Sequence, residues 1–255
     1  MSKIIEHQSN ILFTKNLNPS VKHIFLEVPE AFEFEPGQFI NIEIPSERRK
    51  IKRSYSICSS PMEKRRIEIC VKRIIGGPGS SFLFELSDGD SIYFVGPIGG
   101  FTIKEESKMK DILFISTGTG IGPFRSMIPY LLEKGFSNKI ILFAGYHSEE
   151  EILFDEEFKE MTKDYKNFNY KPIVSKPISQ GYIGDKGYVQ DLIKDHFLHD
   201  FKGDFYICGL SEMIKDVCSI LSACGVESKR VYFDRYDWIL VTYFNRPFLN
   251  LTLTR

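Results

Sequence analysis

The chain has 255 residues, enough for two domains that each bury a core, and 42% of them are hydrophobic, as in an ordinary globular protein. Its 33 basic and 34 acidic residues give a formal net charge of -1. A chain this balanced lacks the broad positive field that gathers nucleic acid or anionic lipid, so neither is an expected partner.

The N-terminal segment, residues 1–11, alternates polar and apolar side chains. It lacks the basic start and the unbroken apolar core of a signal peptide. The most apolar stretch elsewhere, Trp238–Phe244, is far shorter than the roughly 20 residues that cross a bilayer. We therefore expect a cytoplasmic protein without a membrane span.

Short segments of period-two character follow, up to about Phe101, separated by Gly, Pro, Asn and Asp. Their close spacing predicts a small antiparallel β-barrel. The predicted strands are Val21–Val28, Gln38–Ile44, Ser54–Cys58, Arg66–Lys72 and Ser91–Val95. A single short helix, Ser80–Leu86, follows a glycine-rich turn, and its first amides are suited to binding an anion.

From Asp111 the pattern changes to apolar strands that alternate with amphipathic helices, which predicts a parallel α/β sheet. A charged linker, residues 104–110, separates the two halves. The predicted strands are Ile112–Ser116, Ile140–Ala144, Tyr170–Val174, Phe205–Cys208 and Val231–Phe233. One helix follows the first of these strands and ends at Gly135; another begins with Ser211 as its N-cap and ends at Gly225.

The first candidate site is Arg53-Ser54-Tyr55-Ser56 on a predicted strand. Arg53 offers a planar fork of donors for a pyrophosphate, and Tyr55 offers a flat ring and a hydroxyl. The segment from Lys72 to Leu83 adds backbone amides and hydroxyls at the start of the short helix, from Gly79, Ser80 and Ser81. A surface strand and a glycine-rich hairpin would be the structural alternatives.

The second candidate site is the turn between the first strand and the first helix of the α/β half. It reads Thr117-Gly118-Thr119-Gly120-Ile121-Gly122-Pro123. Glycine at every second position removes side chains where a dinucleotide would approach, and Pro123 suits a first helical turn. The turn departs from G-x-G-x-x-G, and tight βα turns are also glycine-rich for packing alone.

These motifs, in this order and with Cys208-Gly209 after the fourth strand, resemble the ferredoxin-NADP reductase family. The resemblance covers about Pro36 to Asp234. It implies a flavoenzyme with FAD in a barrel domain, residues 1–104, and NADP or NAD in an α/β domain, residues 110–237. Residues 238–255 run beyond it, and we assign them no role.

The same resemblance implies roles for individual residues. Ser56 would hydrogen-bond near flavin N5, and Cys208 would pack beside the nicotinamide. Asp234 would organise the nicotinamide and relay a proton, with an ordinary exposed carboxylate as the alternative. An aromatic ring, Tyr236 or Trp238, would shield one face of the flavin.

The choice between NADPH and NADH stays open. The segment after the second strand of the α/β half, residues 145–151, has three glutamates and no arginine, which favours NADH. Lys176 and Lys186 match positions where NADP-specific relatives carry cations. His147 is ambiguous, and Ser148 could contribute to the site or only to a capping box with Glu151.

The five cysteines show neither C-x-x-C pairs nor zinc or iron–sulfur spacing, so we expect free thiols, no metal centre and a separate electron carrier. Basic runs at Arg48–Arg53 and Lys64–Arg66 suggest docking of an acidic ferredoxin or flavodoxin, although such runs are more often solvated surface. The alternatives are an oxygenase reductase component, a free-flavin reductase, a non-turnover electron-transfer subunit, and a dinucleotide-binding module that has lost flavin.

Overall fold

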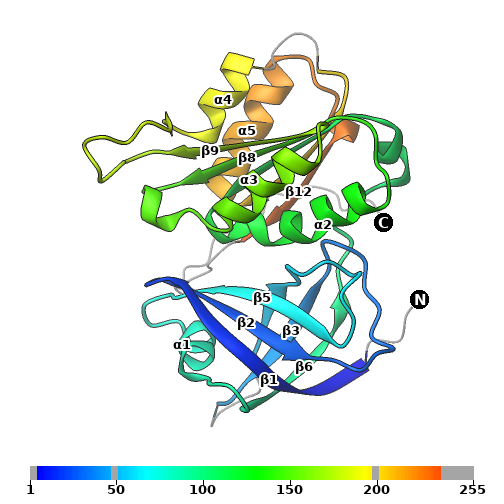
Figure 1. The fold of residues 1–255 in the computed structure, drawn as a ribbon, viewed down its shortest axis with the longest axis vertical. Coiled ribbons are helices and arrows are strands. Elements are labelled where there is room, and N and C mark those ends of the chain that lie inside the picture. Colours follow the sequence, from blue (N-terminus) through cyan, green and yellow to red (C-terminus); the bar gives the residue numbers. More distant parts are fainter. Residues whose placement is uncertain (1–4, 47–50, 197–200, 237–255) are drawn as a thin grey trace, which may run out of the picture.

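The computed structural model describes residues 5–46, 51–196 and 201–236. They form two bodies, an antiparallel barrel and an α/β layer, stacked one above the other (Figure 1). Trp238 and the residues Arg48 to Lys50 of the first basic run lie outside the described residues. No helix of the described part is long and apolar enough to cross a membrane.

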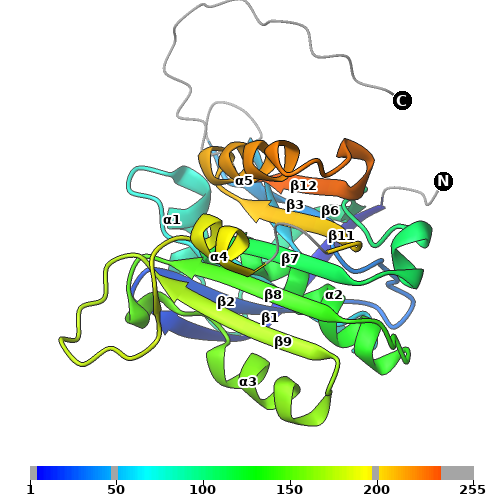
Figure 2. The same cartoon turned by 90° about the horizontal axis from the view of Figure 1, so that it is seen from above.

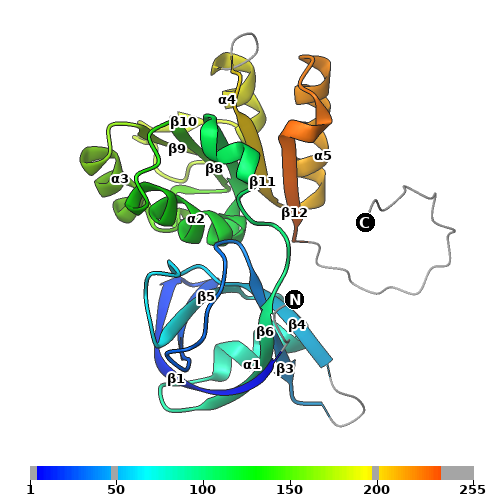
Figure 3. The same ribbon diagram turned by 90° about the vertical axis from the view of Figure 1, so that its right-hand side faces the viewer.

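The barrel is one six-stranded sheet in the order β4-β3-β6-β1-β2-β5, and all its pairings are antiparallel. An isolated bridge between Ile57 and Ile69 joins the two ends of this sheet, so that the strands curl round a common core (Figure 3). The strands are β1 (Ile5–Asn18), β2 (Val21–Glu27), β3 (Phe39–Ile44), β4 (Ile51–Ser56), β5 (Arg66–Lys72) and β6 (Ser91–Ile98). The helix α1 (Pro78–Glu85) follows β5.

The predicted barrel is confirmed, but its longest strand was missed. In β1 only Ser9 and Ile11 are buried, so the strand carries almost none of the apolar alternation that marks a strand in sequence. It forms nevertheless because residues 5–10 pair with β6 and residues 11–18 pair with β2. Its stability therefore comes from sheet partners rather than from its own side chains.

The second body is a parallel sheet in the order β10-β9-β8-β7-β11-β12. Its strands are β7 (Ile112–Thr117), β8 (Ile140–Tyr146), β9 (Phe168–Val174), β10 (Asp185–Lys186), β11 (Asp204–Gly209) and β12 (Val231–Arg235). Helices α2 (Gly122–Glu133) and α3 (Asp155–Asp164) cover one face, and α4 (Val189–His196) and α5 (Ser211–Ala223) cover the other (Figure 2). The strand order is that of a doubly wound fold.

All five predicted α/β strands are present, each extended by one or two residues. The charged linker contains a short 3-10 helix, Glu105–Met109. One boundary was wrong: Ser211 is the first residue of α5, and the N-cap is Leu210 in an extended conformation. Because the carboxyl ends of parallel strands share one edge, the turns after β7, β8, β9 and β11 meet there, as a ligand site in such a sheet requires.

Candidate active site

The start of α1 packs directly on the Arg53–Ser56 strand. A Cβ added to Gly79 would lie 2.8 Å from Arg53 Cγ and 3.3 Å from the Tyr55 hydroxyl, so glycine alone permits this approach. Tyr55 is only 7% exposed, and its burial raises the pKa of the phenol to about 12, against the opposing effect of Arg53. Tyr55 is therefore a neutral hydroxyl beside an exposed guanidinium.

The N-terminus of α1 has no side-chain cap, since the N-cap is Gly77. The Ser80 hydroxyl is used within the turn: it accepts a hydrogen bond from Ile74 N at 3.0 Å and lies 3.2 Å from the Gly77 carbonyl oxygen. Ser81 N donates to that same carbonyl, while its side chain is half-buried. The turn thus presents an uncapped, partly positive helix end next to Arg53, the combination that suits a phosphate group.

Two other residues expected at the flavin have protein partners. Ser54 Oγ donates to Asn41 Oδ1 at 2.7 Å, across the β3–β4 pair. Lys72 Nζ lies 3.7 Å from a carboxylate oxygen of Glu151, which belongs to the α/β body. Both contacts connect structural elements, so these side chains hold neighbouring strands and the two bodies together.

The glycine turn after β7 is held against β11. It forms a 3-10 turn, Gly118–Ile121, and a Cβ on Gly120 would collide with the Cys208 carbonyl oxygen. Gly118 has a φ of 53° and open space around it. The buried hydroxyl oxygens of Ser116 and Thr117 have no hydrogen-bond partner among the described residues. The remaining residues of the turn, Thr119, Gly122 and Pro123, are buried at the start of α2.

Four polar residues lie where neighbouring strands end. His147 is exposed and Ser148 is buried just after β8, and the Lys176 amide after β9 donates to the His147 carbonyl at 2.8 Å. Lys176 and Lys186 are both exposed, and Lys186 pairs with the last residue of β9. The two ammonium groups and His147 therefore gather at one edge of the sheet.

The glutamates of the same region are largely committed to other contacts. Glu149 accepts hydrogen bonds from the amides of Ile178 and Ser179 at 2.8 and 2.6 Å. Hydrogen bonds from Ser179 and Ile178 lower the pKa of this carboxyl to about 2. Glu151 pairs with Lys72. Ser148 makes no side-chain cap, so the capping box is absent.

The two bodies meet at a hydroxyl pair. Tyr236, directly after β12, is anchored by its amide to the Gly209 carbonyl at 2.8 Å, and its hydroxyl donates to Ser56 Oγ at 2.5 Å. Burial raises the pKa of both Tyr236 and Cys208, so both stay protonated. The Cys208 thiol is close enough to the Tyr236 hydroxyl to raise its pKa further. Ser56, Cys208 and Tyr236 thus converge from three strands.

Asp234 lies beside this group, in register with Cys208 on the neighbouring strand. It is partly buried, and burial raises the pKa of its carboxyl, although the Arg235 amide donates to Oδ1 at 3.1 Å. Asp234, which we expected to act together with Ser56 on the nicotinamide, is therefore paired with Cys208, and no hydrogen bond to Ser56 is present among the described residues.

Comparison with known proteins identifies the fold and the domains. Residues 9–103 match the family model of the oxidoreductase FAD-binding domain, and residues 114–219 match that of the oxidoreductase NAD-binding domain. Ferredoxin--NADP reductase B of Sorangium cellulosum (strain So ce56) is 31% identical over 239 residues, which are 90% of this chain and 97% of that protein. This chain belongs to the ferredoxin-NADP reductase family.

Other members of the family are similar over different shares of their length. The phenol hydroxylase P5 protein of Acinetobacter pittii (strain PHEA-2) is 31% identical over 234 residues, 91% of this chain, but the chain spans only 65% of that protein. The solved ferredoxin-NADP+ reductase from Plasmodium falciparum with 2'P-AMP has a TM-score of 0.76 and 27% identity, and the match covers 91% of this chain and 96% of that one. As a family member the chain is an FAD- and NAD(P)-binding oxidoreductase.

The residues present fit the two cofactors of a ferredoxin-NADP reductase. The uncapped helix end beside Arg53 suits the pyrophosphate of FAD, and the space that Gly79 leaves would be filled by any larger residue. On the sheet side, the unpartnered hydroxyls of Ser116 and Thr117 adjoin the open Gly118. A buried hydroxyl without a partner costs free energy, so these two point to a polar ligand.

Sequence reasoning missed one residue that joins the two domains. Arg125 on α2 donates to the Cys58 carbonyl at 3.0 Å and to Glu68 at 2.6 Å, both on the barrel. The only sequence signal for this residue was its position in the helix that follows the glycine turn.

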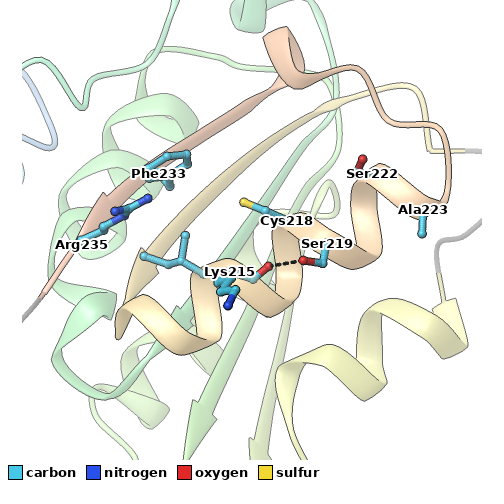
Figure 4. Close-up of a pocket in the computed structure, with 8 residues that line it drawn as sticks. Lys215, Cys218, Ser219, Ser222, Ala223, Phe233 and Arg235 are labelled. Carbon is cyan, nitrogen blue, oxygen red and sulfur yellow. Dashed lines mark hydrogen bonds between the residues drawn. The ribbon is translucent and has the colours of Figure 1, made fainter. Parts of the chain in front are cut away.

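A hollow between α5 and β12 contains none of the expected site residues. Its lining includes Lys215, Cys218, Phe233 and Arg235 (Figure 4). The converging polar groups place the candidate site elsewhere, between the domains.

Proposed function

We propose that the protein transfers electrons from NADPH through bound FAD to a separate one-electron carrier, a ferredoxin or a flavodoxin. When bound, FAD supplies the conversion of a two-electron hydride donor into two single-electron steps. The observation that carries the proposal is the hydroxyl pair of Ser56 and Tyr236. It brings the end of the flavin strand to the end of β11, where the dinucleotide turn and Cys208 lie.

Some side chains of the site bind the cofactors, and others position the reacting groups. Arg53 and the amides at the start of α1 hold the FAD pyrophosphate, and Tyr55 packs its ring along the flavin. Ser56 makes a hydrogen bond at the reacting edge of the flavin. Because its hydroxyl is neutral and can both donate and accept, it does so without a change of charge. Cys208, protonated and buried, limits the position of the nicotinamide by contact rather than by acid–base chemistry. Asp234 orients this group from the adjacent strand.

The preference for NADPH rests on which charges remain free at the edge of the sheet. Glu149 is held in place by backbone amides and Lys72 offsets the charge of Glu151, so less free negative charge opposes a phosphate here than the sequence suggested. Lys176 and Lys186 remain exposed there, alongside the acidic Glu150 and Asp185. The Plasmodium reductase, the relative solved with 2'P-AMP, supports the same choice.

The electron carrier is proposed to dock on exposed basic residues of the barrel. Of the basic residues expected to dock it, Arg65 pairs with Glu30 at 2.7 Å and Arg66 with Glu63, whereas Lys52 and Lys64 are exposed. Exposed pairs are weak and can be exchanged for a partner's carboxylates. The phenol hydroxylase relative favours the second candidate function, the reductase component of an oxygenase, but this chain spans 65% of that protein and 97% of the Sorangium reductase.

The proposal is tested with the full chain loaded with FAD. With NADPH as donor, a plant-type [2Fe–2S] ferredoxin and a flavodoxin are offered in separate reactions, and reduction of each is followed by absorbance. We expect saturable reduction of at least one, weakened by salt because docking is electrostatic. Reduction of free FAD or FMN alone, at a rate that neither carrier changes, would contradict the proposal and favour a free-flavin reductase.

A further inference from the structure

A second polar cluster lies on the outside of the barrel, away from the hydroxyl pair. His23 on β2 and Cys70 on β5 are directly paired across the two strands. Glu68 is two residues before Cys70, so its side chain is on the same face of the sheet. Cys58, just beyond β4, donates its amide to the Glu68 carbonyl at 2.8 Å. The intervening residues Ile24, Ile57, Ile67 and Ile69 point into the barrel core.

The potential ligand atoms of this cluster are close together. Cys58 Sγ lies 3.7 Å from Cys70 Sγ and 3.8 Å from His23 Nε2. These three atoms all lie within 4.8 Å of one another, and they form the single group of this kind among the described residues. Glu68 Oε2 is 3.0 Å from His23 Nε2. His23, Cys58 and Glu68 are almost fully buried, at 3%, 0% and 1% exposure.

The spacing matches that of a tetrahedral zinc site. With zinc–sulfur bonds of about 2.3 Å and zinc–nitrogen bonds of about 2.0 Å, a tetrahedron has edges of about 3.8 Å between sulfurs and about 3.5 Å between sulfur and nitrogen. The observed separations of 3.7 and 3.8 Å need little adjustment to reach these values. Two thiols and an imidazole are ligands that zinc prefers.

The geometry points to a structural zinc site whose protein ligands are His23 Nε2, Cys58 Sγ and Cys70 Sγ, with the Glu68 carboxylate beside it. Binding breaks the two S–H bonds and displaces the proton between His23 and Glu68. These protons go to solvent, and no electron is transferred. The barrel strands β2 and β5 and the segment after β4 would then be joined through one ion.

The charges around the cluster favour a divalent cation. Two thiolates and the Glu68 carboxylate carry three negative charges, and zinc with the Arg125 guanidinium carries three positive ones. Arg125 Nη1 is 2.6 Å from Glu68 Oε2 and 3.9 Å from Cys58 Sγ, so it can balance the charge without being a ligand. Glu157 accepts from Arg125 Nε at 2.9 Å and keeps the guanidinium in place.

The α/β domain covers this site. The Phe154 ring makes an edge contact with His23 at 5.4 Å and lies under Arg125 at 4.5 Å. Cys58 is two residues after Ser56 and follows the flavin strand directly. A metal ion at this position would therefore stabilise the base of the flavin motif and the contact between the two domains, outside the route of the electrons.

A disulfide between Cys58 and Cys70 is the competing reading. Cys58 lies opposite Glu68 rather than Cys70, so the two cysteines are diagonal neighbours on adjacent strands. A disulfide would involve only the two cysteines, whereas the metal site also gives a role to His23.

The test measures metal content and needs no enzyme activity. The full chain, loaded with FAD, is reduced, treated with a chelator and dialysed against zinc chloride, and bound zinc is counted by mass spectrometry. We expect one zinc per chain. Cys70→Ser and His23→Gln should each weaken binding by at least about 100-fold, because each removes a ligand. Cys224→Ser, which changes a thiol in the helix-ending turn after α5, is the matched control and should bind zinc normally.

Two further measurements distinguish loss of a metal ligand from failure of a variant to fold. Cadmium in place of zinc should add a thiolate-to-metal absorption band that Cys70→Ser loses. FAD content reports folding; if one variant fails to retain FAD, the other ligand variant decides the outcome. Absence of zinc from the reduced wild-type chain, equal zinc in wild type and in a folded ligand variant, or a native Cys58–Cys70 disulfide without zinc uptake after reduction would each overturn the proposal.

Discussion

The Tyr236 hydroxyl donates a hydrogen bond of 2.5 Å to Ser56 Oγ, joining residues that are 180 positions apart and that belong to different domains. Burial raises the pKa of the Tyr236 hydroxyl, and the Cys208 thiol is close enough to raise it further. The Tyr236 side chain therefore occupies the space between the two residues that we propose flank the reacting rings. A nicotinamide that enters this space has to displace the Tyr236 ring.

Removing that ring should strengthen dinucleotide binding. In Tyr236→Ala the dinucleotide no longer has to displace the ring or break the hydrogen bond of its hydroxyl, which is worth about 0.5–1.5 kcal/mol, so NADP+ should bind about tenfold more tightly. Tyr236→Phe, which keeps the ring, should show a smaller gain. Titration of the flavin absorbance with NADP+ measures both. Tyr232→Phe, which removes a hydroxyl on β12 that donates to Glu106, is the control. Weaker binding by Tyr236→Ala would show that the ring holds the dinucleotide instead.

Ser56→Ala should slow reduction of the flavin and leave FAD bound. The hydroxyl contributes one hydrogen bond at the reacting edge, so we expect a loss of about tenfold in the reduction rate. Ser54→Ala is the matched control, because Ser54 Oγ binds Asn41 on the adjacent strand. Rapid mixing with NADPH under anaerobic conditions gives both rates. Equal rates for Ser56→Ala and wild type would remove Ser56 from the reaction.

The lysines at the edge of the sheet should determine the choice of dinucleotide. The double variant Lys176→Ala with Lys186→Ala should raise KM for NADPH by about tenfold or more, since it removes charge-assisted contacts worth about 1.5–3 kcal/mol. KM for NADH should change little. Lys163→Ala, an exposed lysine in the last turn of α3, serves as control. A parallel rise in both KM values would indicate general damage to the site.

The partly buried Asp234 gives a pH-dependent effect on stability. Burial raises the pKa of its carboxyl in the folded protein above 3.8, so ionisation destabilises the folded state progressively as the pH rises from the ordinary Asp range to the folded pKa, and fully above it. Asp234→Asn should therefore be the more stable form at neutral pH, with a higher Tm in calorimetry. The difference should shrink as the pH falls toward the ordinary Asp range, where the carboxyl is protonated in both states. A lower Tm for Asp234→Asn at neutral pH would show that the charge is stabilised by contacts.

The elements that sequence analysis located are those whose own side chains show the pattern. The strands β7 and β8 are buried along nearly their whole length and were found, whereas β1 has two buried residues and was missed. The amphipathic helix α3 was also missed, because its buried face is reduced to Phe158. Local pattern therefore predicts an element only when the element supplies its own share of the core.

The candidate site was predicted to the extent that it consists of motifs along the chain. Gly79 against Arg53 and Gly120 against Cys208 are close approaches that the glycine positions indicated. The engagement of Glu149 by the amides of Ile178 and Ser179 was not foreseeable, because it depends on a loop about 30 residues away. The clustering of His23 with Cys58 and Cys70 was likewise invisible, since strand pairing rather than spacing brings them together.

The central claim is that one site between the domains brings a nicotinamide to bound FAD. The most direct measurement is anaerobic stopped-flow absorbance of the FAD-loaded chain mixed with NADPH and, separately, with NADH. We predict that the flavin absorbance is lost in a saturable manner with NADPH and at much higher concentrations with NADH. A chain that does not bind FAD, or whose bound FAD neither dinucleotide reduces, would contradict the account.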